Sequence, residues 1–184
     1  YTKSIGVGGD SVVRIEKGDI LIGPQREGPA AALDGPFPTP TDAMIVEGIV
    51  HFGDYQKAQN AIALIAKKLH MSVQDAARAI VEKTAAMISD NVRQILSEIN
   101  NKPVYTIHEL LEGKIIRPQM LYVAGGPAAI APVIAQNLGY PYSIPEHSEV
   151  SNALGVAVAR TTAEITILAD TEKRELIVSE EGCV

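Results

Sequence analysis

The sequence predicts an α/β protein, because strand-like and helix-like stretches follow one another along the chain. Two short apolar runs near the start are separated by Glu16-Lys17-Gly18, which is the form of a β-hairpin. In the middle, apolar residues recur every three or four positions over two long stretches, which is the period of a helix. Further on, an apolar strand at residues 121–124 leads through two glycines into another helix. We therefore expect a mixed sheet with helices packed against it.

The first elements are predicted from local signals. We expect strands at residues 11–15 and 19–23, joined by the hairpin turn. Residues 23–40 are rich in Gly, Pro and Ala and show no period, so they predict either an ordered loop on the body or a mobile flap. Thr41 and Asp42 have the residue types of a helix start, and they predict a short helix after this loop.

Two longer helices follow. The first is predicted from Asp54 to about His70, because its apolar residues fall on one face. The second begins at Ser72, whose spacing from Asp75 resembles a capping box. Its apolar pattern continues until the segment Asn100-Asn-Lys-Pro103, which ends the helix.

The remaining elements are shorter. The helix after the two glycines carries Pro132 in its first turn, where a missing N–H costs little, and it stops at Gly139. Three further elements complete the order: a short strand at residues 142–144, a small-residue helix at about 149–160, and a hairpin with strands at 163–168 and 175–178.

The composition indicates one domain over residues 1–184 with an aliphatic core. Hydrophobic residues make up 46% of the chain but aromatic residues only 4%, so Ala, Ile, Leu and Val must build that core. The formal net charge is −6 and the basic residues are scattered, which argues against a nucleic-acid partner. No apolar run approaches the ~18 residues of a membrane span, so no membrane association is expected.

Two details concern the compartment and the extent of the chain. Cys183 is the only cysteine, so no disulfide can form within the chain, and we expect a reducing, cytoplasmic location. The first residue is Tyr1 rather than Met, which predicts that the chain is a fragment of a longer protein.

The turn Ala124-Gly-Gly-Pro127 is the first candidate binding site. A strand that ends in two glycines lets a flat ligand approach the backbone, since no Cβ intervenes. The alternative is an ordinary strand-to-helix turn that happens to contain glycine. The apolar strand before it and the small-residue helix downstream favour the binding site. The change Gly126→Val should then block the ligand and also strain a turn that needs a positive φ.

Two other segments allow both a structural and a functional interpretation. Gly6-Val-Gly-Gly-Asp-Ser11 can cradle an anion through its backbone N–H groups. It lacks the lysine of a P-loop and leads into a strand, so the sequence favours a structural turn. Asp42 is explained fully as a helix cap, and the alternative is a carboxylate aimed at a metal or a substrate. As a cap alone, Asp42 should tolerate replacement by Asn at little cost in stability.

The histidines give no metal site from the sequence, because their spacing matches no ligand motif. The metal ligands are therefore unknown. His147 is kept as a candidate because Ile144-Pro-Glu-His-Ser-Glu149 is a polar turn beside the glycine turn. The others, expected to be surface or capping residues, are His51, His70 and His108.

Several motifs occur in a particular order along the chain. They are Ser4-Ile-Gly-Val-Gly-Gly-Asp-Ser11, Ile22-Gly-Pro-Gln25, Pro38-Thr-Pro-Thr-Asp-Ala43, Gly48 and Gly53-Asp54, continued by residues 124–132 and 149–159. In order and spacing they resemble the hydantoinase/oxoprolinase A-type subunit family, within the actin, sugar-kinase and heat-shock-chaperone ATPase superfamily. The resemblance covers most of the chain from Ser4 to about Arg160. It implies a ribonuclease-H-like lobe of the actin-like ATPase fold, here as part of the C-terminal lobe.

The resemblance also implies a chemistry and its residues. Family members use ATP, with Mg²⁺, to activate a cyclic amide or related carbonyl by phosphorylation, and a B-type partner subunit is expected. The implied adenosine contacts are Gly125, Gly126 and Pro127, with Ser151, Asn152 and Gly155 close by. By the resemblance, Gly8, Gly9 and Asp42 belong to motifs that face the substrate or phosphate cleft, and His147 is added to the cleft candidates because of its polar turn. The expected catalytic carboxylates are Asp42 and Asp10.

Two departures from the family pattern limit what the resemblance implies. Phosphate loops of the form Asp-x-Gly-Gly-Thr are absent and would lie before Tyr1, so this chain is expected to supply the adenosine side of the site only. Residues 26–34 lack the Asp-Pro-Gly-Pro run expected after Gly-Pro-Gln, which leaves the substrate open. The alternatives are an activase-type or nucleotide-sensing ATPase lobe acting on a protein partner, a ketone-carboxylase-type subunit, and a purely structural lobe.

Overall fold

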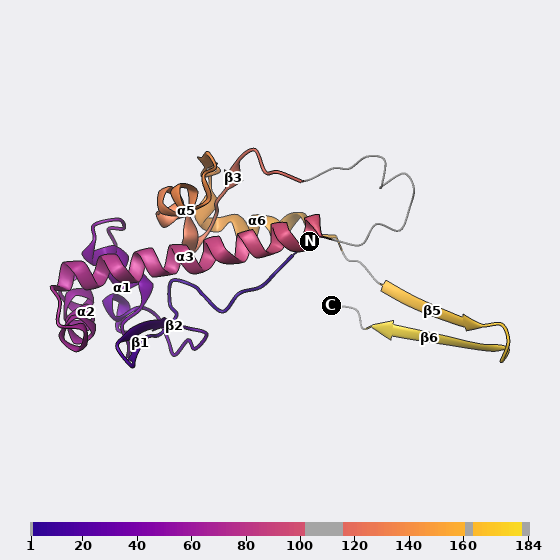
Figure 1. Cartoon of the computed structure of the whole chain (residues 1–184), viewed down its shortest axis with the longest axis horizontal. Helices are drawn as coiled ribbons and strands as arrows, with labels where there is room; N and C mark the ends of the chain where they lie inside the picture. The colour runs from indigo at the N-terminus through magenta and orange to yellow at the C-terminus, as the bar shows by residue number, and fades with distance from the viewer. Residues whose placement is uncertain (1, 102–115, 161–163, 182–184) are drawn as a thin grey trace. The chain divides into compact units, whose positions relative to one another are not determined.

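The structure is a computed structural model that describes residues 2–101, 116–160 and 164–181 (Figure 1). It contains two compact units, Tyr1–Glu149 and Val150–Val184. Helices and strands both occur, which confirms the α/β class. The strands of the described residues form three two-stranded sheets rather than the expected mixed sheet. Within the same residues, no helix is long and apolar enough to cross a membrane.

The predicted N-terminal hairpin is present. Strands β1 (Val13–Glu16) and β2 (Asp19–Ile22) pair antiparallel, with Glu16 opposite Asp19. The two turn residues have positive φ, 51° at Lys17 and 87° at Gly18. Two consecutive residues with positive φ give a turn whose twist matches that of the strands.

The short helix α1 (Pro40–Val46) begins earlier than predicted. Its N-cap is Thr39 rather than Thr41 or Asp42. Thr39 accepts a hydrogen bond from the backbone N–H of Asp42, and the Asp42 side chain accepts one from the N–H of Thr39, which is a capping box. The sequence prediction missed this start because Pro40 separates the cap from the first apolar residue.

The loop before α1 has the ordered form. It contains a short 3₁₀ helix, η1 (Ala31–Leu33), and the backbone C=O of Ala32 accepts a hydrogen bond from the N–H of Asp54 at 2.9 Å. Asp34 ends η1 in the left-handed conformation and forms an ion pair with Lys57. This hydrogen-bonded ion pair raises the pKa of Lys57 above its usual value.

The two long helices are confirmed with their caps. Helix α2 (Tyr55–Leu69) is capped by Asp54, and helix α3 (Val73–Asn100) by Ser72. The core of the first unit forms where α1, α2, the hairpin and the N-terminal part of α3 come together (Figure 1). Its largest fully buried apolar side chains are those of Ile62 and Ile80.

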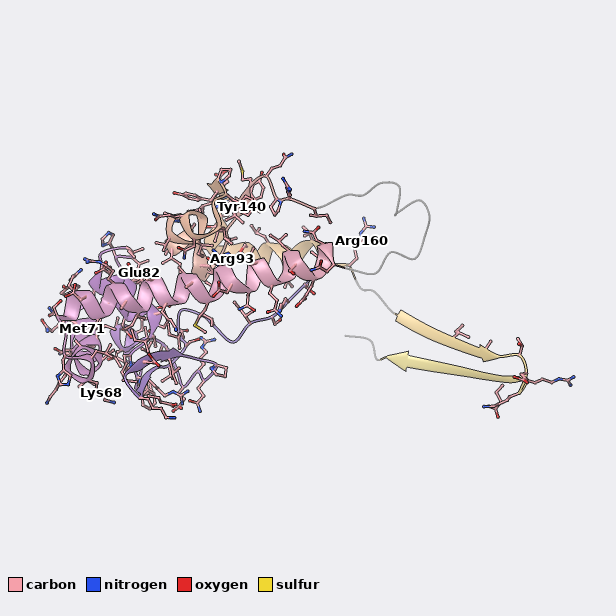
Figure 2. The ribbon with its side chains drawn as sticks, viewed as in Figure 1. Lys68, Met71, Glu82, Arg93, Tyr140 and Arg160 are labelled. Carbon is pink, nitrogen blue, oxygen red and sulfur yellow. The ribbon has the colours of Figure 1, made fainter. Side chains whose placement is uncertain are left out.

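A second group of elements packs farther along α3. Strands β3 (Leu121–Tyr122) and β4 (Tyr142–Ser143) are parallel, and between them lie the 3₁₀ helix η2 (Gly126–Ile130) and helix α5 (Ala131–Leu138). Helix α5 packs against α3, and the Arg93 guanidinium donates to the backbone C=O of Asn137 (Figure 2). Strand β3 is shorter than predicted, because the chain leaves it for the Gly125 turn.

The second unit contains helix α6 (Ser151–Val158) and a hairpin. The hairpin strands are β5 (Glu164–Asp170) and β6 (Glu175–Glu181), in antiparallel register with Asp170 opposite Glu175. A short 3₁₀ helix, η3 (Ser148–Val150), spans the boundary between the two units. The expected single domain over the whole chain stays a prediction.

Candidate functional site

Segments far apart in the sequence meet at one cavity of the first unit, of about 270 Å³. We call it the central cavity. The loop with Gly9, the start of α1 with Thr41, and the turn with Gly125 and Gly126 each contribute to its wall. Its other lining residues are Met44, Val50, Phe52, Ala129 and Glu149. Two motifs that the sequence singled out separately therefore share one site.

Gly9 is held against α1 by two hydrogen bonds. Its backbone C=O accepts from the N–H of Thr41 at 2.9 Å and from Thr41 Oγ1 at 2.9 Å. A Cβ at Gly9 would lie 2.6 Å from Thr41 Oγ1, which is closer than real Cβ atoms come. A glycine at this position lets the loop reach the helix start.

The two glycines of the second motif have different roles. Gly125 has φ 71° and ψ −150°, a conformation that is essentially restricted to glycine. Its N–H donates to the C=O of Ser148 at 2.8 Å, which ties the turn to η3. Gly126 has no positive φ, and nothing lies within 4 Å of a Cβ built on it. The expectation that Gly126 needs a positive φ is therefore wrong, because Gly125 makes the turn.

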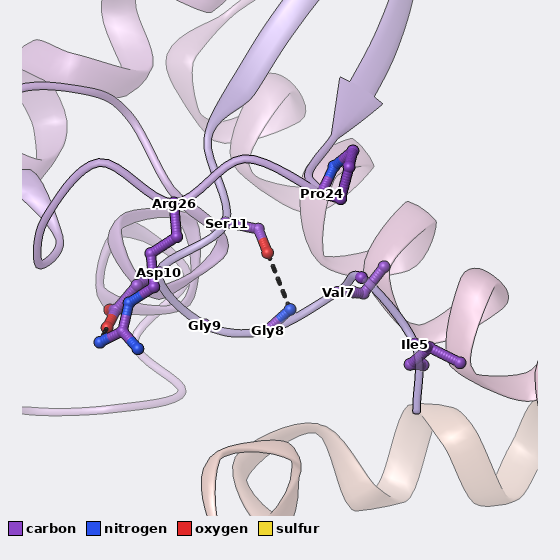
Figure 3. A pocket seen from close by; sticks show the side chains of 9 residues that line it. Ile5, Val7, Gly8, Gly9, Asp10, Ser11, Pro24 and Arg26 are labelled. Atoms are coloured by element: carbon purple, nitrogen blue, oxygen red, sulfur yellow. Dashed lines mark hydrogen bonds and ion pairs between the residues drawn. The ribbon is translucent and has the colours of Figure 1, made fainter. Parts of the chain in front are cut away.

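A second cavity, of about 260 Å³, lies along the Gly8–Gly9 loop (Figure 3). We call it the loop cavity; its lining residues are Ile5, Gly6, Val7, Gly8, Gly9, Asp10, Ser11, Pro24 and Arg26. Gly9 lines both cavities. The loop is closed by two hydrogen bonds, from Gly8 N–H to Ser11 Oγ at 2.9 Å and from Ser11 N–H to the Gly8 C=O at 3.1 Å.

Asp10 and Arg26 face one another at the loop cavity (Figure 3). Arg26 Nη2 lies 2.6 Å from Asp10 Oδ2, and the Arg26 side chain is 70% exposed. The ion pair uses one terminal nitrogen of the guanidinium, whose fork of N–H groups can bind a second oxyanion. The arrangement places one accessible carboxylate and one accessible cation beside the glycine loop.

Asp42 is fully buried, and hydrogen bonds engage both of its carboxylate oxygens. Oδ1 accepts from the N–H of Ala32 at 2.8 Å, and Oδ2 accepts from the N–H of Ala31 at 3.1 Å. Oδ2 also accepts from the N–H and the Oγ1–H of Thr39, both at 2.9 Å. These contacts join η1 to the start of α1, so they favour the structural interpretation. A catalytic role for Asp42 stays a prediction.

The other predicted site residues lie in several places. Pro127 lines a narrow space of about 20 Å³ with Gly8, Gly9 and Gly126. His147 has φ 60°, and its Nε2 lies 3.7 Å from Oε1 of Glu146. It lines neither the central nor the loop cavity. The remaining candidates, Ser151, Asn152 and Gly155, lie on α6 in the second unit. His108 and Cys183 lie outside the described residues.

Sequence reasoning selected neither Phe52 nor Glu149 as a site residue, although both line the central cavity. Phe52 is 49% exposed although it is aromatic, and Glu149 brings a carboxylate from η3. Phe52 directly precedes the Gly53-Asp54 motif, and Glu149 ends the polar turn after β4. The available signal was an apolar ring next to the Gly53-Asp54 motif, but this signal does not indicate which cavity the ring reaches.

The described residues show no cluster of side chains that would hold the expected Mg²⁺ by itself. These residues contain no group of three or more His, Cys, Asp or Glu side chains that can hold a metal ion. Asp42 uses its oxygens for four hydrogen bonds, and Asp10 is paired with Arg26.

Comparison with known protein families matches residues 1–165 to hydantoinase/oxoprolinase. This chain belongs to the hydantoinase/oxoprolinase family. The match confirms the family predicted from the motifs, and it includes the central cavity, the loop cavity and α6. The family is one of ATP-dependent enzymes. Comparison with curated proteins gives no match.

Proposed function

We propose that this chain forms the adenosine-binding side of an ATP site in a hydantoinase/oxoprolinase-like enzyme. The enzyme activates a cyclic amide or related carbonyl by phosphorylation. The observation that carries the proposal is that Gly9 and Gly126, from two separate motifs, line the same cavity. In this proposal the first unit belongs to the ribonuclease-H-like lobe of an actin-like ATPase, and a B-type subunit completes the enzyme.

The size and lining of the central cavity support a nucleoside as its ligand. Its volume of about 270 Å³ lies just below the roughly 300–1,000 Å³ of small-molecule sites, so it suits part of a nucleotide. The base lies against the Gly126 backbone, where no Cβ intervenes, and Phe52 offers an apolar ring to it. Thr41 and Glu149 provide the polar groups that orient the sugar or the base.

The phosphate groups extend from the central cavity over the Gly8–Gly9 loop. Gly9 lines both cavities, so a ligand that passes it reaches the loop cavity. There the Arg26 guanidinium offers N–H groups to an oxyanion. Asp10 holds Arg26 in place and is the accessible one of the two proposed catalytic carboxylates. We assign Asp42 the task of holding η1 against α1 beside this path.

The reaction proceeds in three steps. The carbonyl oxygen of the substrate attacks the γ-phosphorus of ATP, the bond to the β,γ-bridging oxygen breaks, and ADP leaves. Water then attacks the activated carbon, a proton passes to the ring nitrogen and the C–N bond breaks, which leaves an acyl phosphate. A second water cleaves the acyl phosphate to the carboxylic acid and inorganic phosphate. Positioning and charge stabilisation dominate the first step, so the residues of this chain act by holding the nucleotide.

A graded series at Gly126 tests the nucleoside assignment in the intact protein. Nothing lies within 4 Å of a Cβ there and φ is ordinary, so Gly126→Ala and Gly126→Val should leave the fold standing. ATP affinity, measured by calorimetry, should fall with side-chain size and reach at least a roughly tenfold loss for Val, about 1.4 kcal/mol. An unchanged affinity in a Gly126→Val protein with a native melting temperature would remove the adenosine assignment.

A further inference from the structure

A third cavity, of about 340 Å³, shares no lining residue with the central or the loop cavity. We call it the β1–α2 groove. One wall is strand β1, and the other is the end of helix α2 with Leu64, Ile65 and Lys68. Phe37 and Pro38 complete the lining. The proposed ATP site makes no use of this groove.

The groove exposes an edge of β1. When the β1–β2 register is continued by one residue, Val12 lies opposite Gly23. Gly23 N–H donates to the C=O of Val12 at 3.0 Å, so these two residues form a hydrogen-bonded pair. Because hydrogen bonding alternates along an antiparallel pair, Val13 and Ile15 direct their backbone groups away from β2. Val13 N–H uses this outer edge to donate to the C=O of Pro38 at 2.9 Å. Among the described residues, no hydrogen bond joins the Ile15 backbone to an element beyond β2. Its N–H and C=O are therefore open to another strand.

The side chains along the groove combine apolar surface with positive charge. Phe37 is 40% exposed and Leu64 is 62% exposed, while the buried Ile65 lies at the floor. Lys68, labelled in Figure 2, lines the groove, and among the described residues it forms no ion pair. Arg14 donates through Nη1 to Gln25, and its buried Nε–H has no acceptor.

We propose that the β1–α2 groove binds an extended segment of a partner protein that carries a carboxylate. The segment adds to the outer edge of β1, where the N–H and C=O of Ile15 pair with its backbone. Its apolar side chains cover Phe37 and Leu64, and its carboxylate pairs with Lys68. Two cations, Arg14 and Lys68, line the groove against the single carboxylate of Glu16, so charge complementarity selects an acidic segment.

A library of random heptapeptides with free C-termini, displayed on phage, gives the probe. Selection on the whole chain should enrich peptides in which apolar residues alternate and a carboxylate lies at one end. The best enriched peptide is then made with a fluorescent label, and its affinity is measured by anisotropy. Failure to enrich any such sequence overturns the proposal.

Two neighbouring lysines provide a matched pair of variants. Lys67 and Lys68 are both exposed at the end of α2, but only Lys68 lines the groove. Lys68→Glu should weaken peptide binding at least tenfold, whereas Lys67→Glu should change it less than twofold. Equal losses in the two variants would mean that general charge attraction, rather than this groove, binds the peptide.

Hydrogen exchange at Ile15 tests the strand addition itself. In the ¹⁵N-labelled chain, the Ile15 amide should exchange at least tenfold more slowly with saturating peptide than without it. Unchanged exchange of this amide at saturation excludes pairing at the β1 edge. A chain that dimerises without peptide, and that Lys68→Glu returns to monomer, would assign the groove to a second copy and overturn the partner segment.

Discussion

Asp42 shows how a buried carboxylate differs from an exposed cap of the same residue type. Its two oxygens accept four hydrogen bonds from Ala31, Ala32 and Thr39 in a site without solvent access. Asp54 caps α2 from an exposed position, and one of its oxygens accepts both hydrogen bonds. An amide in place of the carboxylate therefore has very different consequences at the two positions.

We predict that Asp42→Asn lowers stability, in contrast to the small cost expected for a simple cap. In the variant, an NH₂ group takes the place of one carboxylate oxygen, either Oδ1 or Oδ2. At both positions this NH₂ donor faces backbone N–H donors and finds no acceptor. A buried donor left without an acceptor costs about 1–3 kcal/mol. Urea unfolding should show this loss for Asp42→Asn and a loss below about 0.5 kcal/mol for Asp54→Asn, because Asn caps as well as Asp. Equal stability of the two variants would contradict the role given to the Asp42 carboxylate.

The glycines of the first motif give a second residue-scale prediction. A Cβ at Gly9 meets Thr41 Oγ1 at 2.6 Å, whereas nothing lies within 4 Å of a Cβ at Gly8. Gly9→Ala should push the hydroxyl away from the Gly9 C=O and cost about 1–3 kcal/mol, the usual range for overpacking. Gly8→Ala should stay within about 0.5 kcal/mol of the wild type. Thermal unfolding of the two alanine variants decides whether the close contact to Thr41 is necessary.

At the scale of the elements, the ends of the helices show where the sequence is not optimal. Helix α2 ends at His70, which has φ 55° and ψ 40°. Helix α5 ends at Gly139 with φ 72° and ψ 27°, the same left-handed conformation with the residue type that favours it. The left-handed conformation costs a non-glycine residue roughly 1–2 kcal/mol in steric strain.

Introducing glycine at one helix end and removing it at the other should change the free energy of unfolding in opposite directions. His70→Gly should raise the free energy of unfolding by about 0.5–1 kcal/mol, because it removes the Cβ from a left-handed residue. Gly139→Ala should lower it by about 1 kcal/mol, and no neighbouring atom lies within 4 Å of the new Cβ to complicate the result. Urea denaturation of both variants provides the measurement, and a destabilised His70→Gly protein would contradict the backbone argument.

At the scale of the whole molecule, the proposed function gives this chain only part of an ATP site. The described residues place glycines and apolar side chains at the central cavity and one cation, Arg26, at the loop cavity. Phosphate contacts supply much of the electrostatic stabilisation in phosphoryl transfer. A cavity of nucleoside size with one paired arginine supplies little of this electrostatic stabilisation.

We therefore predict that the isolated chain binds ATP weakly and hydrolyses it negligibly. Calorimetry should give a dissociation constant well above the micromolar range, which corresponds to less than about 8 kcal/mol of binding free energy. Adenosine should bind nearly as well as ATP, because in the proposed site the central cavity contacts only the nucleoside. Micromolar ATP affinity or steady turnover by this chain would show that it holds a complete phosphate site.

Local signals determined most of the secondary structure from the sequence. The caps Asp54 and Ser72, the Lys17–Gly18 turn and the Gly139 stop each depend on residues within about one turn of the chain. The ordered motifs also identified the family, since their spacing is a property of the sequence itself. The start of α1 was placed two residues late because its capping box straddles Pro40.

Contacts between distant segments were decided only by the tertiary structure. The sequence marked Gly9, Gly126 and Asp42 as candidates, but only the folded chain brings Gly9 and Gly126 to one cavity and sets Asp42 against Ala31 and Ala32. It also assigns the strained turn to Gly125 rather than to its neighbour. The physical reason is that periodicity and capping depend on neighbours along the chain. The walls of a cavity depend on how packing of the core directs segments that are far apart in sequence.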